Sequence, residues 1–267
     1  SRINEQSIIG NTSFSSYPAS REYVNILQGD NAFIDGVWFH VLDENGERTP
    51  ISDAELDPNQ PTYFIIHGFT AGRGDAWFYD NLQYLNNQDY KLGRNDWKRW
   101  QAFNSTQHGI GLTVQAYNPD ANVVIVDWGN FDGPLDSTPI YTAPALFGTE
   151  RTANALADYI LTQGLNPENI TLVGHSLGGH VAGKTGQRIK QDIAQGLYAD
   201  NVSSLGTIIG MDTAGPIFQC LLPSQRLSAD DAINVYNLHT SANFGYDGPL
   251  AQYDLYFNTS SLSINQT

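Results

Sequence analysis

The chain has 267 residues, 40% of them hydrophobic, and a formal net charge of −15 from 13 basic and 28 acidic residues. This length suits one domain with a sizeable core, and the acidic balance argues against binding to nucleic acid or to an anionic membrane face. No stretch approaches the roughly 20 apolar residues that cross a bilayer, so no transmembrane segment is expected.

The first predicted element is an antiparallel hairpin at the edge of a sheet. Two strand-like pieces flank residues 44–46 in the segment GVWFHVLDENGERTPI. An Asn-Gly pair between such pieces is a strong hairpin signal. We therefore expect the amino-terminal part of the sheet to be antiparallel.

Short apolar runs rich in β-branched and aromatic residues follow, and each predicts a strand. These runs are 62–68, 122–129, 170–176, 205–212, 233–240 and 253–258. Between the second and third runs, apolar residues recur at helical spacing from Ala153 to Leu161, ahead of a glycine stop at Gly164. This alternation predicts an α/β fold, a mostly parallel sheet with helices on both faces and a ligand site at the carboxyl ends of its strands.

Residues 169–186, NITLVGHSLGGHVAGKTG, fit two different motifs. Gly178 followed by Gly183-Lys184-Thr185 resembles a phosphate-binding loop, and Asp212 could stand on its magnesium side. Such a loop needs a strand that leads directly into the first glycine and a helix that begins at the lysine. Because four residues separate the strand from Gly178, nucleotide binding is the less favoured alternative.

The second motif is a serine nucleophile on a sharp turn. Gly174-His175-Ser176-Leu177-Gly178 has glycine two residues before and two after the serine, where larger side chains would collide with neighbouring elements. The N–H of Leu177 and that of Phe69, in the His67-Gly68-Phe69 segment after an earlier strand, are the predicted oxyanion donors. The small residues Gly179, Ala182, Gly183 and Gly186 are then expected on a helix face packed closely on the sheet.

A carboxylate is needed to orient the base of such a serine. Asp212 ends the strand that follows Ser176 and suits this role. Asp127 also ends a strand but precedes the serine, so its predicted role is to fix a loop by hydrogen bonds.

Together these residues resemble the pancreatic-lipase-like family of α/β-hydrolases, which includes triacylglycerol lipases, phospholipases A1 and catalytically silent relatives. The matching segments, in the order of the family, are HGF (67–69), VDWG (126–129), GHSLGGHVAG (174–183), DTAGPIF (212–218), DAINVYNLHT (231–240) and GPLAQYDLYFN (248–258). The resemblance implies a single α/β-hydrolase catalytic domain over residues 1–267. It also implies a secreted enzyme that hydrolyses lipid esters at an interface without a required cofactor, with Ser176 as nucleophile and Asp212 as triad acid.

The catalytic base is the open question. In the family the catalytic histidine follows a lid that lies beyond the strand matching YDLYFN, whereas this chain ends at Thr267. The resemblance therefore implies a domain that is incomplete at its carboxyl end, with its base beyond Thr267. Within the chain, His239 is the candidate by position, because it ends the strand after Asp212. The histidine at this place in the family is not the base, which favours a structural role for His239.

The resemblance also implies that some relatives bind a structural calcium ion, through a loop that matches PSQRLSADD (223–231). Arg226 and Asp231 match, whereas Pro223 and Ser228 replace carboxylates, so a calcium site is not predicted. Segment 89–117 alternates basic and aromatic residues and predicts either a solvated helix or a cap over the site. A silent binding or storage protein stays an alternative to an esterase, and glycerides and phospholipids both stay open as substrates.

Overall fold

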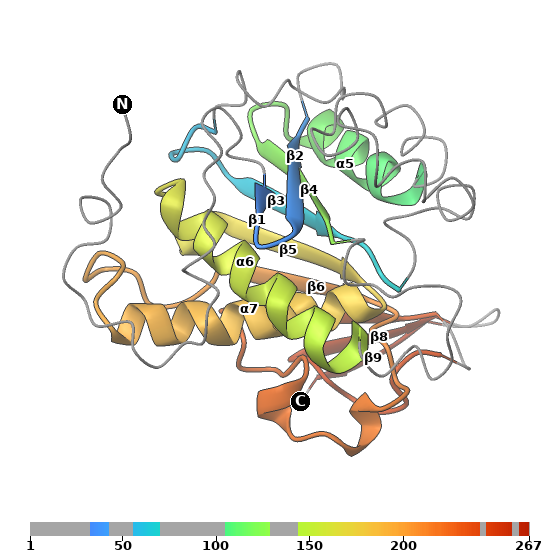
Figure 1. Ribbon diagram of the computed structural model, residues 1–267. Coiled ribbons are helices and arrows are strands. Elements are labelled where there is room, and N and C mark those ends of the chain that lie inside the picture. Colours follow the sequence, from blue (N-terminus) through green and yellow to red (C-terminus); the bar gives the residue numbers. More distant parts are fainter. Residues whose placement is uncertain are drawn as a thin grey trace, which may run out of the picture.

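A computed structural model describes residues 33–42, 56–69, 105–128, 144–240, 244–257 and 262–266 (Figure 1). These ranges contain a sheet of nine strands in the order β1-β2-β4-β3-β5-β6-β7-β8-β9. The strands are β1 Phe33–Ile34, β2 Val37–Val41, β3 Thr62–Ile66, β4 Asn122–Asp127, β5 Ile170–His175, β6 Thr207–Met211, β7 Asn234–His239, β8 Tyr253–Phe257 and β9 Leu262–Gln266. Every apolar run singled out in the sequence after residue 60 therefore forms a strand.

Six neighbouring strands, in the order β4-β3-β5-β6-β7-β8, are paired in parallel. The alternation of apolar runs and helices predicts this arrangement. Only β1, β2 and β9 add antiparallel pairs to this sheet, at its two edges. The prediction of an α/β-hydrolase architecture with a mostly parallel sheet is confirmed. Within the described ranges, no helix combines the length and the apolar character needed to cross a membrane.

An antiparallel hairpin at the amino-terminal edge of the sheet is formed by β1 and β2. Strands β1 and β2 meet at Asp35 and Gly36, which have φ angles of 48° and 89°. An Asp-Gly pair adopts such positive φ angles readily and is itself a hairpin signal, which the sequence analysis did not use. The turn predicted at residues 44–46 lies outside the described residues, as does the 91–103 part of the predicted cap.

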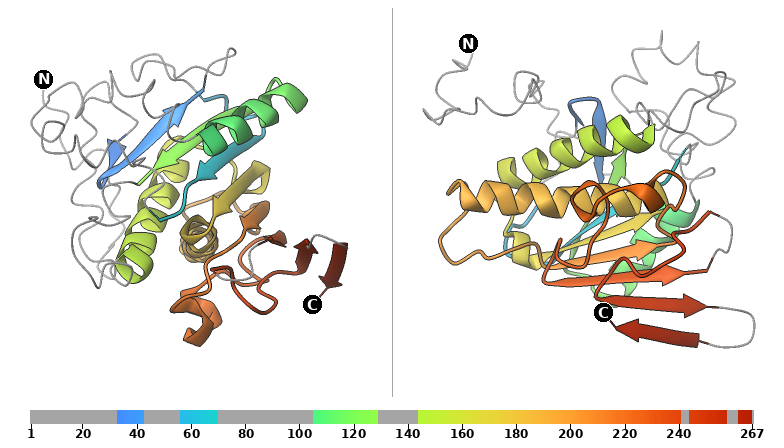
Figure 2. Two further views of the ribbon diagram at one scale, coloured as in Figure 1. Left: turned by 90° about the vertical axis from the view of Figure 1, so that its right-hand side faces the viewer. Right: turned by 90° about the horizontal axis from the view of Figure 1, so that it is seen from below.

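Helices cover both faces of the sheet (Figures 1 and 2). Helices α6 (Thr149–Thr162) and α7 (Leu177–Ala194) pack together on one face, and α5 (Ser105–Tyr117) lies on the other. The predicted helix before Gly164 is α6, and Gly164 has a φ of 65°, the left-handed conformation that ends helices.

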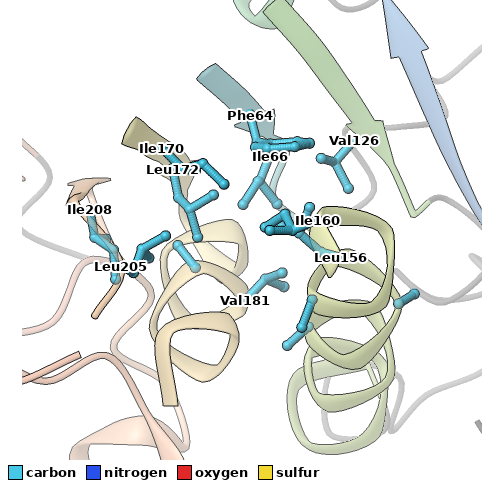
Figure 3. Packing of buried hydrophobic residues seen from close by; sticks show 14 of the residues in the cluster. Phe64, Ile66, Val126, Leu156, Ile160, Ile170, Leu172, Val181, Leu205 and Ile208 are labelled. Carbon is cyan, nitrogen blue, oxygen red and sulfur yellow. The ribbon is translucent and has the colours of Figure 1, made fainter. Parts of the chain in front are cut away.

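The main core lies between the sheet and the helices α6 and α7. Figure 3 shows Leu156 and Ile160 of α6 and Val181 of α7 against Phe64 and Leu172 of the central strands. These side chains are fully buried, and each contributes about 1.5–3 kcal/mol by its removal from water. This core fixes the carboxyl ends of β3, β5 and β6 relative to the start of α7.

The glycines of α7 correct one prediction. A Cβ at Gly183 would lie 2.7 Å from Cα of Leu227, and one at Gly186 would lie 2.1 Å from the carbonyl oxygen of Asp231. At Gly179 it would lie 2.3 Å from Oγ1 of Thr213. Gly179, Gly183 and Gly186 therefore face the segment that follows β6, and not the strands of the sheet.

Candidate active site

Ser176 lies in a strained turn between β5 and α7. Its φ of 54° and ψ of −118° are unusual for a residue with a side chain. A Cβ at Gly174 would come within 2.2 Å of the carbonyl oxygen of Gly178, and one at Gly178 within 2.4 Å of that of Ile66. The two glycines that the motif requires are thus needed for steric reasons.

Backbone hydrogen bonds hold this turn at the end of the sheet. The N–H of Ser176 donates to the carbonyl oxygen of Met211 at 2.9 Å. The carbonyl oxygen of Ser176 accepts from the N–H groups of Gly179 (3.1 Å) and Ala214 (3.2 Å). Leu177 is the first residue of α7, so its N–H belongs to the helix start, where N–H groups lack intrahelical acceptors and favour negative charge.

The backbone at Gly68 lies directly beside Ser176, because a Cβ at Gly68 would be 2.8 Å from Cβ of the serine. His67 controls the orientation of this segment. Its Nδ1 lies 2.8 Å from the carbonyl oxygen of Gly68, and its Nε2 accepts the N–H of Trp128 at 3.0 Å. These partners assign a neutral imidazole with the proton on Nδ1.

The His67 bond also sets the direction of the next N–H group. In a trans peptide the C=O and the following N–H point in opposite directions. Because Nδ1–H of His67 holds the Gly68 carbonyl, the N–H of Phe69 is directed away from His67. The indole of Trp128 stacks on the imidazole of His67 at 5.3 Å and donates to its carbonyl oxygen at 2.9 Å, which fixes this segment further.

Asp127 stands behind the same segment. Its Oδ1 lies 3.5 Å from Nε2 of His67, and its Oδ2 lies 3.9 Å from Nε2 of His40. It contacts the interior side of the loop at the end of β3. This placement fits the loop-fixing role expected for Asp127.

Asp212 follows β6 directly and has a φ of 46°. Its N–H donates to the carbonyl oxygen of Leu238 at 2.7 Å, and both carboxylate oxygens accept hydrogen bonds from Thr240. The carboxylate also acts on His175, the residue before the nucleophile. Partial burial lowers the pKa of His175, and the attraction of Asp212 opposes this effect without cancelling it.

Thr240 is a partner of Asp212 that the sequence pattern did not reveal. Strands β6 and β7 pair in register with Met211 opposite Leu238, so Asp212 and Thr240 both leave the sheet at the same edge. A threonine directly after a strand that neighbours the aspartate strand is the signal that could have identified it.

His239 has a different environment from the one a catalytic base requires. Its Nε2 lies 2.8 Å from Oδ1 of Asp254 and 3.0 Å from Nδ2 of Asn237, and its ring stacks on Tyr256 at 4.1 Å. A carboxylate only accepts, so Nε2 carries the proton. The hydrogen bond from Nε2 goes to Asp254, and the amide nitrogen of Asn237, itself a donor, lies beside it. The geometry therefore supports the structural role for His239 and not the role of base.

The other candidate for the base is the histidine that the family resemblance implies beyond Thr267. The described residues end at Gln266, so this candidate lies outside them, as does Thr267 itself. A base beyond Thr267 therefore stays a prediction.

His180 is also an interior group. Its Nε2–H donates to the carbonyl oxygen of Ala214 at 2.7 Å, its Nδ1 accepts from Leu227 at 3.1 Å, and its ring stacks on Phe218 at 3.6 Å. Burial lowers the pKa of His180 to about 3, against the opposing effect of the Ala214 carbonyl. It joins the segment after β6 to α7.

The Gly-Lys-Thr motif lies within α7, which begins at Leu177 and not at the lysine. Lys184 is buried and pairs with Glu150 of α6 at 2.9 Å, while the hydroxyl of Thr185 donates to the carbonyl oxygen of Val181 at 2.8 Å. Lys184 thus connects α7 to α6, Thr185 bonds within α7, and the two residues do not form a phosphate-binding loop.

The segment that matches the calcium loop does not fit a calcium ion. The guanidinium of Arg226 donates to the carbonyl oxygen of Leu227 at 2.8 Å and lies over the ring of Tyr246. The carboxylate of Asp231 accepts from the N–H of Ser228 at 2.7 Å. In the part of the chain that the structure describes, no group of three acidic, histidine or cysteine residues could hold a metal.

Comparison with known proteins gives a consistent assignment. The family model described as "Lipase" matches residues 39–262. Phospholipase A1 1 of Dolichovespula maculata is 42% identical over 84% of this chain and 60% of its own length. Phospholipase A1 of Vespula maculifrons is 32% identical over 74% of this chain and 56% of its own length. Lipase member H of Mus musculus is 28% identical over 76% of this chain and 36% of its own length.

This chain thus spans between about a third and three fifths of the length of these relatives. Among solved structures, esterase PE8 is 18% identical with a TM-score of 0.39, over 70% of this chain and 72% of that chain. Structural similarity at this level does not bear on function.

Proposed function

Because the chain belongs to the lipase family, we propose that it hydrolyses carboxylic esters of lipids through an acyl-enzyme on Ser176. The observation that carries this proposal is the juxtaposition at Ser176. A strained serine at the start of α7 lies beside the backbone of Gly68, the residue before Phe69. We infer from this that the N–H groups of Phe69 and Leu177 face the Ser176 hydroxyl. This is the arrangement that nucleophilic attack on an ester carbonyl requires.

In the proposed reaction, Oγ of Ser176 attacks the ester carbonyl carbon while an imidazole removes the hydroxyl proton. The N–H groups of Phe69 and Leu177 stabilise the negative charge on the former carbonyl oxygen. The tetrahedral intermediate then expels the alcohol, which takes the proton from the imidazolium. Water repeats these steps on the acyl-enzyme and releases the fatty acid.

Asp212 is the proposed acid of the triad. Its two bonds from Thr240 hold the carboxylate at the same sheet edge as Ser176, where it can orient an imidazole and stabilise the imidazolium. We assign the role of base to a histidine beyond Thr267, as the family resemblance implies, since the ring of His239 donates to Asp254.

Phospholipids are the favoured substrate class. Two relatives above 30% identity are phospholipases A1, whereas lipase member H of Mus musculus is 28% identical. We further propose that the protein is secreted and acts at a lipid–water interface. Phe244 is 74% exposed, and its carbonyl oxygen accepts from Gly215, shortly after Asp212, so an apolar side chain stands near the site.

A fluorophosphonate probe applied to the full-length protein tests the proposed function, because only an activated serine reacts with it. We expect peptide mapping to find the label on Ser176 and the label to be absent from Ser176→Ala. Ser203→Ala is a matched control, since Ser203 is bonded to Glu168 and should not affect labelling. Fatty acid release from phosphatidylcholine vesicles and from triacylglycerol emulsions then compares the two substrate classes.

A folded full-length protein that neither labels nor releases fatty acid would contradict the proposal. That result would favour a lipase-like binding or storage protein. Release from the triacylglycerol alone would contradict the preference for phospholipids but not the ester hydrolysis.

A further inference from the structure

The side chain of Gln187 holds the segment after β6 onto α7 through three oxygen atoms. Its Nε2 lies 3.0 Å from the carbonyl oxygen of Arg226, 3.0 Å from Oδ1 of Asp231 and 3.3 Å from the carbonyl oxygen of Pro223. These acceptors come from both ends of the 223–231 segment, the orange segment in Figure 1. One nitrogen therefore closes this loop.

The acceptors form the kind of set that usually surrounds a hard cation. Backbone carbonyl and carboxylate oxygens are the ligands that calcium prefers, at about 2.3–2.6 Å. Here the central atom is an amide nitrogen at hydrogen-bond distances. Its two N–H groups serve three acceptors, so at least one proton is shared.

The loop is also closed from its other side. The second carboxylate oxygen of Asp231 accepts from the N–H of Ser228, and Asp231 is only 1% exposed. The loop backbone rests directly on Gly183 and Gly186, where a Cβ would meet Leu227 and Asp231. With Gln187 in place, the centre of the loop is filled by protein atoms.

This loop is connected to the nucleophile turn. The N–H of Leu227 donates to His180, which in turn donates to the carbonyl oxygen of Ala214. The N–H of Ala214 donates to the carbonyl oxygen of Ser176. A change in the position of the loop can therefore alter the backbone position of Ser176 through these three successive hydrogen bonds.

We propose that the amide of Gln187 takes the place of a cation in this loop, so that the loop closes without calcium. It follows that calcium and chelators do not change the stability of the domain through this loop. It also follows that Gln187→Glu creates a calcium site. The new carboxylate would face Asp231 and two carbonyl oxygens, and a bound cation would relieve their repulsion.

Thermal unfolding followed by circular dichroism tests this inference without reference to enzymatic activity. The wild-type protein, Asp231→Asn, Gln187→Glu and Gln191→Glu are each measured in calcium chloride and in EGTA. Gln191 lies one turn further along α7, so Gln191→Glu makes the same charge change away from the loop.

We expect the difference in Tm between calcium chloride and EGTA to be the same for the wild-type protein and for Asp231→Asn. Gln187→Glu should be less stable than the wild type in EGTA. Calcium at about ten times the dissociation constant should raise its Tm by roughly 3–6 °C relative to Gln191→Glu.

Two results would overturn the proposal. The first is a calcium stabilisation of the wild type that Asp231→Asn lacks, because the loop would then bind the ion beside Gln187. The second is a Gln187→Glu protein that responds to calcium no more than Gln191→Glu. The comparison of wild type with Asp231→Asn does not need the Gln187 variant to fold.

Discussion

Thr240 donates both its backbone N–H and its hydroxyl to the carboxylate of Asp212. Asp212 has a positive φ and leaves the sheet where β6 ends, so its backbone alone does not define where the carboxylate points. The two bonds from the neighbouring strand define it. In the proposed mechanism, Thr240 is thus a positioning residue for the triad acid.

Replacement of Thr240 by valine keeps the shape of the side chain and removes one donor. Hydrogen bonds to charged groups contribute about 1.5–3 kcal/mol, so we expect a roughly 10- to 100-fold loss in kcat with little change in KM. Steady-state kinetics on a phospholipid substrate measures this effect. Thr171→Val, on β5, is the control, and an unchanged kcat for Thr240→Val would refute the positioning role.

His67 is expected to position the Phe69 N–H through the Gly68 carbonyl. In His67→Leu the carbonyl loses its donor and the Trp128 N–H loses its acceptor. We expect a loss in kcat of about 10²-fold, the lower end for loss of one oxyanion donor, and a loss of stability of about 1–3 kcal/mol.

His40→Leu is the matched control for His67→Leu. Both imidazoles lie near Asp127, but the described contacts to Gly68 come from His67. Urea denaturation separates the loss of stability from the loss of kcat. Equal losses of kcat in the two variants would argue against a specific effect on the oxyanion donors.

His180 makes stability depend on pH in the acidic range. Burial lowers the pKa of His180 to about 3 in the folded protein, below the ordinary value of 6.5. Between these values the unfolded chain binds the proton and the folded chain does not, so stability falls as pH decreases from 6.5 towards 3. The slope from this group approaches about 1.4 kcal/mol per pH unit.

Denaturant titrations at several pH values measure this slope. His180→Gln keeps a donor and an acceptor but has no group that titrates in this range. We expect it to be less stable than the wild type near neutral pH and less sensitive to acid between pH 6.5 and 4. Parallel curves for the two proteins would exclude His180 as the source.

Gly178 provides a test of the nucleophile turn that does not involve chemistry. A Cβ at this position would lie 2.4 Å from a backbone oxygen of β3, which cannot move without disturbing the sheet. Gly178→Ala should therefore lower stability by at least about 1–3 kcal/mol, the usual cost of overpacking. Gly248→Ala, whose Cβ would meet nothing closer than 3.7 Å, should change stability little.

The sequence by itself determined the features that depend on local pattern. Apolar runs of strand length marked β3 to β8, and the helical spacing before Gly164 marked α6. The glycines around Ser176 could be interpreted because their spacing is typical of a sharp strand–turn–helix motif, although the contact at Gly178 comes from Ile66 of β3. Parallel strands also bring their carboxyl ends to one edge, so the common location of Ser176 and Asp212 followed from strand order.

Only the tertiary structure decided which side chains meet across long separations. Glycines on one face of α7 show that something approaches closely, but not that it is the 227–231 segment. A histidine after a strand can serve either a serine or another partner. His239 is bonded to Asp254 because β7 and β8 pair in a register that sequence pattern does not specify. The bonds from Thr240 to Asp212 and from Gln187 to the 223–231 segment were likewise not predicted from sequence. Hydrogen-bond partners such as these are set by packing and register rather than by periodicity.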